Sequence, residues 1–207
     1  MIADPNNILL SRYLQAYFGF EVWAAVSRHD ALTNPSMHNA DVAMTQRKQI
    51  GRQCLIRLAR NRVRYSRYQV NKIEFPNGNS SLSYSGNTVA AAFSSCGQIR
   101  GIGVDIEQNR EMPDGADRLI LSARERARMS CTAKQFGCAL LRVWTVKEAI
   151  LKADPLNRKT GWLTAYELLR PHKRMGEAVM KRRNYSKTFQ YISFAFGAGY
   201  VSFAVCL

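Results

Sequence analysis

The sequence predicts an α+β fold in which two stretches follow the same plan, a helix and then antiparallel strands. Residues 43–60 carry apolar side chains at four-residue spacing, which is typical of an amphipathic helix, and strand patterns follow it. Residues 136–153 show a second helical pattern, and the tail after it alternates like a β-hairpin. The stretches 43–107 and 136–206 share this order of elements, but they are too dissimilar to count as a sequence repeat.

The composition predicts a folded protein that does not span a membrane. The 207 residues suffice for one domain or two small ones, and 46% hydrophobic residues predict a folded chain. The first ten residues have no basic n-region and no apolar h-region, and no apolar run approaches the ~20 residues of a membrane span. Five scattered cysteines predict reduced thiols. We therefore expect a cytoplasmic protein with no membrane partner.

The N-terminal part is first aromatic and then basic. Residues 8–26 are rich in aromatic and aliphatic side chains and predict either a helix or a pair of strands. Residues 27–41 hold turn-forming types and predict a loop. Between residues 42 and 72 there is no acid, while nine Lys or Arg occur. The helix over 43–60 should therefore show a basic side.

Three further stretches predict β-structure. Residues 81–93 read as a strand, a Gly-Asn turn and a second strand, and residues 99–107 as another strand. Residues 191–205 alternate around a glycine-containing turn, which predicts a terminal hairpin.

A helical pattern also covers residues 117–130. Ser122 and Asp117 are the candidate N-caps of this helix. We interpret Glu125, within it, as structural.

Acids on a strand and on a helix form the candidate site. Asp105 and Glu107 share one face of the strand because side chains alternate with a period of two. Trp144, Glu148 and Lys152 recur every four residues and share one side of the helix. Three carboxylates suit Mg²⁺, and a lysine beside them suits a phosphate. Either fragment alone is more often an ordinary solvated pair of charges.

The two fragments, G-I-G-V-D-I-E and V-W-T-V-K-E-A-I-L-K, together resemble the signature motifs of the surfactin-synthetase-type 4'-phosphopantetheinyl transferases. The resemblance runs from about Ser80 to the C-terminus, with a weaker echo back to about Arg47. It implies Mg²⁺-dependent transfer of phosphopantetheine from coenzyme A to a serine of an apo acyl or peptidyl carrier protein, releasing adenosine 3',5'-bisphosphate. It also implies a pseudo-twofold pair of α/β subdomains with the active site at their junction. We place the coenzyme A side in residues 1–103 and the acids and catalytic helix in 104–207.

The resemblance assigns roles to the acids and the helix lysines. Asp105, Glu107 and Glu148 would hold the metal, and the general base would be a carboxylate near Glu148 or Glu107, or a metal-bound water. Lys152 would stabilise charge on the leaving phosphate, with Lys147 a weaker candidate. The catalytic set is thus Glu148, Lys152 and Glu107.

Coenzyme A contacts follow from the same resemblance. Arg47 or Lys48 falls where a basic residue holds the 3'-phosphate, and Lys72 is the nearest basic residue to a Gly-Lys-Pro segment that this chain lacks. Ser83 and Tyr84 lie in a stretch that resembles the family's N-x-S-H-S-G motif, with Tyr84 where histidine is usual. Tyrosine donates a hydrogen bond but carries no positive charge near pH 7.

The net charge agrees with a transferase that binds coenzyme A, and it leaves two other functions open. Thirty Lys and Arg against 15 Asp and Glu give a formal charge of +15, which favours polyanionic partners. Coenzyme A and an acidic carrier protein would account for it, and we expect a monomer. A basic nucleic-acid-binding protein would explain the charge but not the acids. A catalytically impaired relative that binds carriers would explain Tyr84.

Overall fold

The computed structural model describes residues 5–28, 40–59, 79–108, 110–129, 133–156, 162–182 and 185–207. The chain separates into two compact units, residues 1–99 and 100–207. Lys72, one of the predicted coenzyme A contacts, lies outside the described residues.

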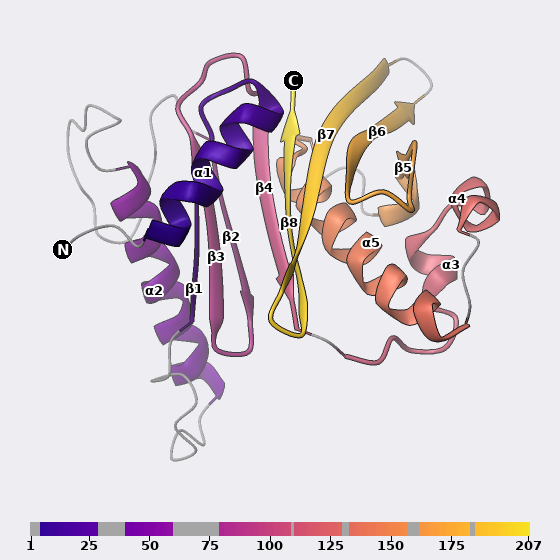
Figure 1. Ribbon diagram of the computed structural model, residues 1–207, viewed down its shortest axis with the longest axis horizontal. Helices are drawn as coiled ribbons and strands as arrows, with labels where there is room; N and C mark the ends of the chain where they lie inside the picture. The colour runs from indigo at the N-terminus through magenta and orange to yellow at the C-terminus, as the bar shows by residue number, and fades with distance from the viewer. Residues whose placement is uncertain are drawn as a thin grey trace. The chain divides into compact units, whose positions relative to one another are not determined.

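The first unit is a three-stranded antiparallel sheet with helices (Figure 1). Its elements are α1 (Pro5–Phe18), β1 (Trp23–Arg28), α2 (Ala40–Ala59), β2 (Asn79–Ser85) and β3 (Thr88–Ser94). The strand order is β1-β3-β2. Cys54 and Leu55 of α2 pack on Ala91 and Phe93 of β3. The aromatic stretch at 8–26 is thus one helix followed by one strand, and the predicted helix and Gly-Asn hairpin are confirmed.

The second unit is a five-stranded antiparallel sheet with one long helix. Its elements are β4 (Gly101–Glu107), α3 (Ala116–Ile120), α4 (Ala123–Arg128), α5 (Ala133–Ala153), the 3-10 turn η3 (Leu163–Ala165), β5 (Tyr166–Leu168), β6 (Met175–Arg182), β7 (Tyr185–Phe196) and β8 (Gly199–Cys206). The strand order is β4-β8-β7-β6-β5. Helix α5 packs on β4 and β8. Each unit therefore has a helix on a small antiparallel sheet, and the α+β class is confirmed.

Strand β4 is not in the sheet that the sequence suggested. The stretch 43–107 was expected to form one copy of the plan, but β4 pairs with β8, with Val104 opposite Phe203. Sheet partners are set by tertiary packing, which the period of a strand does not encode. The predicted pseudo-twofold relation and the junction site stay predictions.

The helical pattern at 117–130 is interrupted. Ser122 has extended backbone angles and caps α4, accepting a hydrogen bond from the Glu125 N–H while Glu125 accepts one from the Ser122 N–H. This reciprocal capping box ends α3 and starts a new helix. The candidate cap Ser122 is thus confirmed.

Two glycines bring β4 and α5 together at the level of the backbone. A Cβ at Gly103 would lie 1.8 Å from the carbonyl oxygen of Ala149, and one at Gly101 would lie 1.9 Å from that of Ala153. Both glycines therefore face α5. Because side chains alternate along a strand, Asp105 and Glu107 point to the same face.

Two expectations from composition can be compared with the structure. Among the helices it describes, none combines the length and the apolar character needed to cross a membrane. Cys54, Cys96, Cys138 and Cys206 are free thiols.

Candidate active site

The site begins with an ion pair between β4 and α5. Asp105 is 5% exposed, and its Oδ1 accepts a hydrogen bond from Lys152 Nζ at 2.7 Å. The same ammonium donates to the Val104 carbonyl at 3.2 Å. The residues belong to different fragments of the sequence signature, so the fold brings the two fragments together.

Glu148 lies one helical turn before Lys152. Burial raises the pKa of the Glu148 carboxyl, the nearby Asp105 and Glu107 carboxylates raise it further, and Lys152 opposes them. Glu148 also lies on the same side of α5 as Lys152, which is 2.7 Å from Asp105. The three predicted acids and Lys152 therefore form one electrostatic group, called below the acid cluster.

Glu107 ends β4 at the more open side of the cluster. Its side chain is 22% exposed, and its Oε1 lies 3.4 Å from the Arg110 guanidinium. The Arg110 guanidinium carbon lies 5.8 Å from the centre of the Trp144 ring, a cation–π distance. Arg110 was not among the predicted residues, and its place three residues after the D-x-E strand is the sequence signal for it.

The donor set suits a divalent cation in charge and chemistry. Three carboxylates and one ammonium leave two negative charges, and Mg²⁺ prefers oxygen ligands. In the structure Lys152 takes one oxygen of Asp105, and no three acid, His or Cys side chains of the described residues gather around a common point as a metal-holding group.

Comparison with known proteins identifies the family of this chain. The family described as the 4'-phosphopantetheinyl transferase superfamily matches residues 101–204, half of the chain. The chain belongs to this superfamily. No curated protein matches the chain. The matched segment contains all four residues of the acid cluster, and members of the superfamily transfer 4'-phosphopantetheine.

Lys147 of this transferase lies in the core and not at the acid cluster. Lys147 is fully buried, and its Nζ donates to Glu125 Oε2 at 2.6 Å, to the Ile120 carbonyl at 2.7 Å and to the Leu163 carbonyl at 3.3 Å. Burial lowers the pKa of the Lys147 ammonium more than Glu125 raises it. All three protons of this ammonium are used inside the core. The expectation that Lys147 stabilises the leaving phosphate is therefore corrected to a structural role.

Glu125 completes this buried network of the transferase. It is fully buried, and it accepts hydrogen bonds from the Ser122 N–H at 2.7 Å and the Leu168 N–H at 2.8 Å as well as from Lys147. The carboxylate thus ties α4, β5 and α5 together, in agreement with its interpretation as structural.

The predicted coenzyme A contacts of the first unit fall on both faces of its sheet. Ser83 is buried, whereas Tyr84 points to α2, where its hydroxyl would lie 2.3 Å from a Cβ at Gly51. Arg47 lies one helical turn before Gly51, and Lys48 is exposed. Since Ser83 and Tyr84 alternate along β2, they cannot both contact a group on the same face.

Arg52 joins Tyr84 on the α2 side of the sheet. Burial raises the pKa of the Tyr84 hydroxyl, and the positive charge of Arg52 lowers it. Sequence reasoning did not single out Arg52 from the other basic residues of the helix. The signal for it is its position next to Gly51, on which Tyr84 packs.

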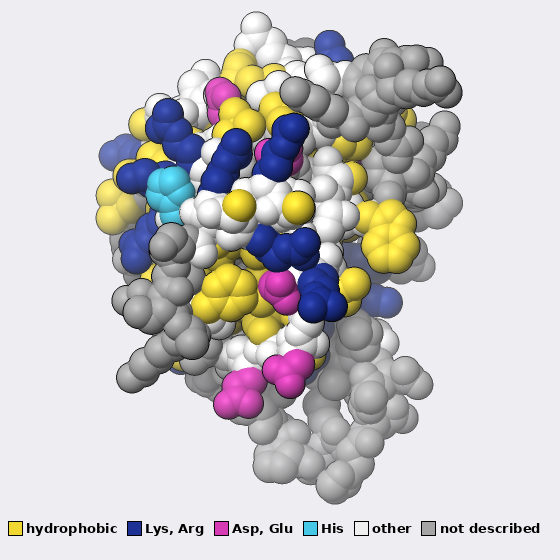
Figure 2. All heavy atoms as spheres, turned by 90° about the vertical axis from the view of Figure 1, so that its right-hand side faces the viewer, with side chains coloured by type: hydrophobic (Ala, Val, Ile, Leu, Met, Phe, Trp, Pro, Cys, Tyr) yellow, Lys and Arg dark blue, Asp and Glu magenta, His cyan; other side chains and the backbone are white. Residues whose placement is uncertain are grey.

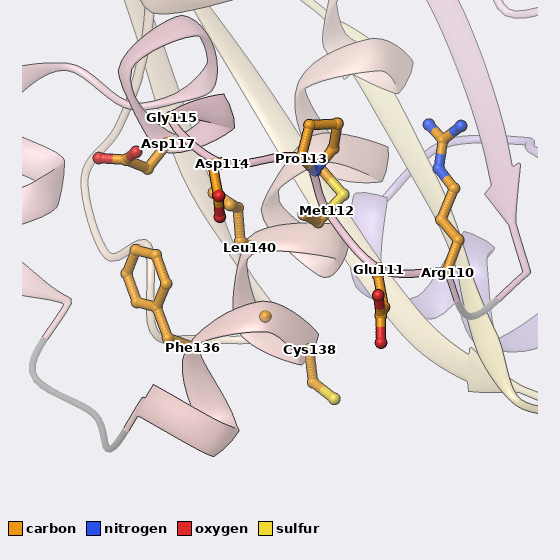
Figure 3. Close-up of a pocket in the computed structure, with 11 residues that line it drawn as sticks. Arg110, Glu111, Met112, Pro113, Asp114, Gly115, Asp117, Phe136, Cys138 and Leu140 are labelled. Atoms are coloured by element: carbon orange, nitrogen blue, oxygen red, sulfur yellow. The ribbon is translucent and has the colours of Figure 1, made fainter.

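A cavity of about 660 Å³ lies beside Arg110, the residue that pairs with Glu107. It is lined by the loop after β4 and the early part of α5, namely Arg110, Glu111, Met112, Pro113, Asp114, Gly115, Asp117, Phe136, Gly137, Cys138 and Leu140. Figure 3 shows the acids of the loop and the apolar side chains of the helix around this space. Arg110 belongs to the cavity wall and to the Glu107 pair. None of the predicted acids lines the cavity.

Proposed function

We propose that this enzyme transfers the 4'-phosphopantetheinyl group of coenzyme A to a serine of an apo acyl or peptidyl carrier protein with the help of Mg²⁺, as a transferase of the surfactin-synthetase type. The observation that carries the proposal is the 2.7 Å pair of Lys152 and Asp105. The pair joins β4, which carries Asp105 and Glu107, to α5, which carries Glu148. Such a cluster suits the chemistry of a pyrophosphate.

The acids would hold the ion. Asp105 and Glu148 are the proposed ligands, with Glu107 beside them. When bound, Mg²⁺ would neutralise the pyrophosphate oxygens and make the β-phosphorus more open to attack. Lys152 supplies a positive charge at the same place, which would stabilise the charge that develops on the leaving phosphate.

The transfer step needs a proton acceptor. The serine Oγ would bond to the β-phosphorus while the bond from this phosphorus to the bridging oxygen breaks, and adenosine 3',5'-bisphosphate would leave. The serine proton would go to a carboxylate of the chain. Glu148 has a raised pKa in the cluster without an ion and would take the proton only if Glu107 replaced it as the ligand, because a carboxylate that holds Mg²⁺ is a weak base. Glu107 is the alternative, since its side chain is 22% exposed.

The first unit would bind the charged end of coenzyme A. Arg47 lies one helical turn before Gly51, against which Tyr84 packs. The charge of Arg52 acts on the Tyr84 hydroxyl, and arginine is well suited to phosphate. Tyr84 would donate one hydrogen bond in place of a charged histidine. Lys48, Lys72 and Ser83 are the remaining candidates.

The test is transfer to purified apo carriers. With coenzyme A and Mg²⁺, mass spectrometry should show a gain of one phosphopantetheinyl group. Asp105→Ala and Glu148→Ala should abolish the gain while circular dichroism stays unchanged. Glu111→Ala is the matched control, because Glu111 is an exposed acid of the loop after β4 and should transfer normally.

Two outcomes would contradict the proposal. Normal transfer by a folded Asp105→Ala or Glu148→Ala variant would refute the assigned acids. Binding of carriers by the wild type without any modification would favour a catalytically impaired relative.

A further inference from the structure

The second unit carries a cationic surface away from the residues assigned so far. It consists of six exposed cations on α4 and on the turn between β5 and β6, here called the basic patch: Arg124, Arg126, Arg128, Arg170, Lys173 and Arg174. On the face that Figure 2 shows, Lys and Arg side chains gather and few acids appear. Two acids, Glu167 and Glu177, lie at the patch, so its net charge is +6 − 2 = +4.

The two parts of the patch are joined. The Arg128 guanidinium donates to the Leu169 carbonyl at 3.4 Å. Glu167 lies between the arginines of α4, 3.8 Å from Arg124 and 3.6 Å from Arg128. The cations of the helix and of the turn therefore form one continuous surface.

The turn is held in a fixed shape from below. Arg170 and Pro171 start a β-turn in which the Lys173 N–H donates to the Arg170 carbonyl at 3.0 Å, with proline at the position that such turns favour. Arg142 of α5 is 6% exposed, and its guanidinium donates to the Pro171 carbonyl and, at 2.7 Å, to the Lys173 carbonyl.

Two further contacts complete the support. The Tyr191 hydroxyl donates to the Arg170 carbonyl at 3.0 Å, and the Ser193 N–H donates to the Arg174 carbonyl at 2.7 Å. A buried arginine is costly to desolvate, and here it supports only an exposed turn. Cations held on a fixed backbone lose less entropy when a partner binds than cations on a loose loop.

We propose that the basic patch docks an acidic surface of the carrier protein whose serine the enzyme modifies. The proposal rests on the proposed function. A net charge of +4 favours an anionic partner over a neutral or basic one. Because Glu167 and Glu177 interrupt the positive charge, the patch fits the mixed surface of an acidic protein better than the uniform phosphate backbone of a nucleic acid.

The patch is near enough to the acid cluster for one partner to reach both. The turn between β5 and β6 lies at one edge of the five-stranded sheet and β4, which carries Asp105, lies at the other, so about 19 Å separate them across the sheet at ~4.8 Å for each strand spacing. Even a small domain of ~80 residues has a radius of gyration of about 12 Å and spans about 30 Å. A carrier seated on the patch can therefore present its serine to Glu148.

The test compares two triple variants that lose equal charge. Arg126→Gln, Arg170→Gln and Arg174→Gln together weaken the patch, and Arg12→Gln, Arg28→Gln and Arg100→Gln remove three exposed cations elsewhere. Transfer is measured with purified apo acyl and peptidyl carrier proteins at saturating coenzyme A. The patch variant should raise the KM for the carrier about tenfold at low salt and leave kcat and the KM for coenzyme A unchanged. The control should stay within about twofold, and 0.5 M salt should shrink the difference.

The outcomes separate this proposal from the proposed function. Equal carrier KM values for wild type and patch variant, or equal rises in both variants, would overturn docking on the patch. So would a patch variant that loses affinity for an RNA or DNA oligonucleotide but keeps its carrier KM. If the wild type modifies no carrier, the proposed function fails. Docking on the patch can then still be tested by fluorescence anisotropy with the same carriers. Binding that is weakened in the patch variant alone supports docking, and any other result refutes it.

Discussion

Replacing Lys147 by methionine should be strongly destabilising. Lys147 and Glu125 are both fully buried, with 2.6 Å between the ammonium nitrogen and the carboxylate oxygen. Lys147→Met leaves Glu125 charged and buried without its cation, which typically costs about 3–5 kcal/mol. A loss of that size is a large fraction of the roughly 5–15 kcal/mol that holds a domain folded.

The double variant tells an isolated ion pair from a network. An isolated buried pair can often be replaced by apolar residues with little loss. Here Glu125 also accepts from the backbone of Ser122 and Leu168, and Lys147 also donates to two carbonyls. Each of these backbone groups that stays buried without a partner costs about 1–3 kcal/mol. Lys147→Met with Glu125→Leu should therefore remain at least about 2 kcal/mol less stable than the wild type.

The assay is equilibrium unfolding in urea followed by tryptophan fluorescence. With a slope of about 2 kcal/mol per molar urea, a loss of 4 kcal/mol moves the midpoint down by about 2 M. Lys173→Met, at an exposed position, should change the stability by less than about 0.5 kcal/mol. A Lys147→Met midpoint within about 0.5 M of the wild type would refute the reasoning, as would full recovery in the double variant.

Further predictions concern Glu148 and the contact of β4 with α5. Because the Glu148 pKa is raised in the folded enzyme, its ionisation disfavours folding once the pH rises through that raised value and has no effect well below its ordinary value. The free energy of unfolding of Glu148→Gln should therefore exceed that of the wild type by about 1 kcal/mol at pH 8, a small gain because partial exposure screens the repulsion. At pH 3 the two proteins should be equally stable, and the variant should transfer nothing at any pH. Equal thermal stability of variant and wild type at both pH values would contradict this. Mn²⁺ affinity, measured by calorimetry, should fall as the pH is lowered through the raised pKa, because a protonated carboxyl is a poor ligand; an affinity that does not change between pH 8 and pH 5 would argue against Glu148 as a ligand. Gly103→Ala should cost more than about 3 kcal/mol in urea unfolding, because its Cβ would lie 1.8 Å from the Ala149 carbonyl oxygen. Gly137→Ala is the control, since no atom lies within 4 Å of its Cβ and alanine favours a helix by roughly 0.5–1 kcal/mol; a harmless Gly103→Ala would show that the strand and helix can move apart.

Local chemistry made much of the second unit predictable. The period of two along β4 placed Asp105 and Glu107 on one face, and the four-residue spacing on α5 placed Glu148 and Lys152 on one side. The capping residue Ser122 was recognisable because short polar side chains favour the start of a helix. These features depend on neighbours in the sequence.

Contacts between distant residues were not predictable in the same way. Nothing in the composition of β4 identifies β8 as its partner, because strand pairing depends on the packing of the whole sheet. Lys147 was misread because lysine is almost always exposed. A signal was present, since Lys147 lies four residues after Val143 and three before Ile150, on a side of the helix whose apolar members are fully buried. A cation on such a stripe requires a buried acid.

At Gly101 and Gly103, strand β4 meets helix α5 through peptide groups rather than through side chains. Elsewhere, exchanging one aliphatic residue for another changes the separation of a helix and a sheet by the thickness of a methyl group. At these two glycines no side chain can be added, so the spacing between the strand that carries Asp105 and the helix that carries Glu148 is set by van der Waals contact of main-chain atoms. Mutational drift in the surrounding core can therefore alter stability while leaving the separation of the reactive groups almost unchanged.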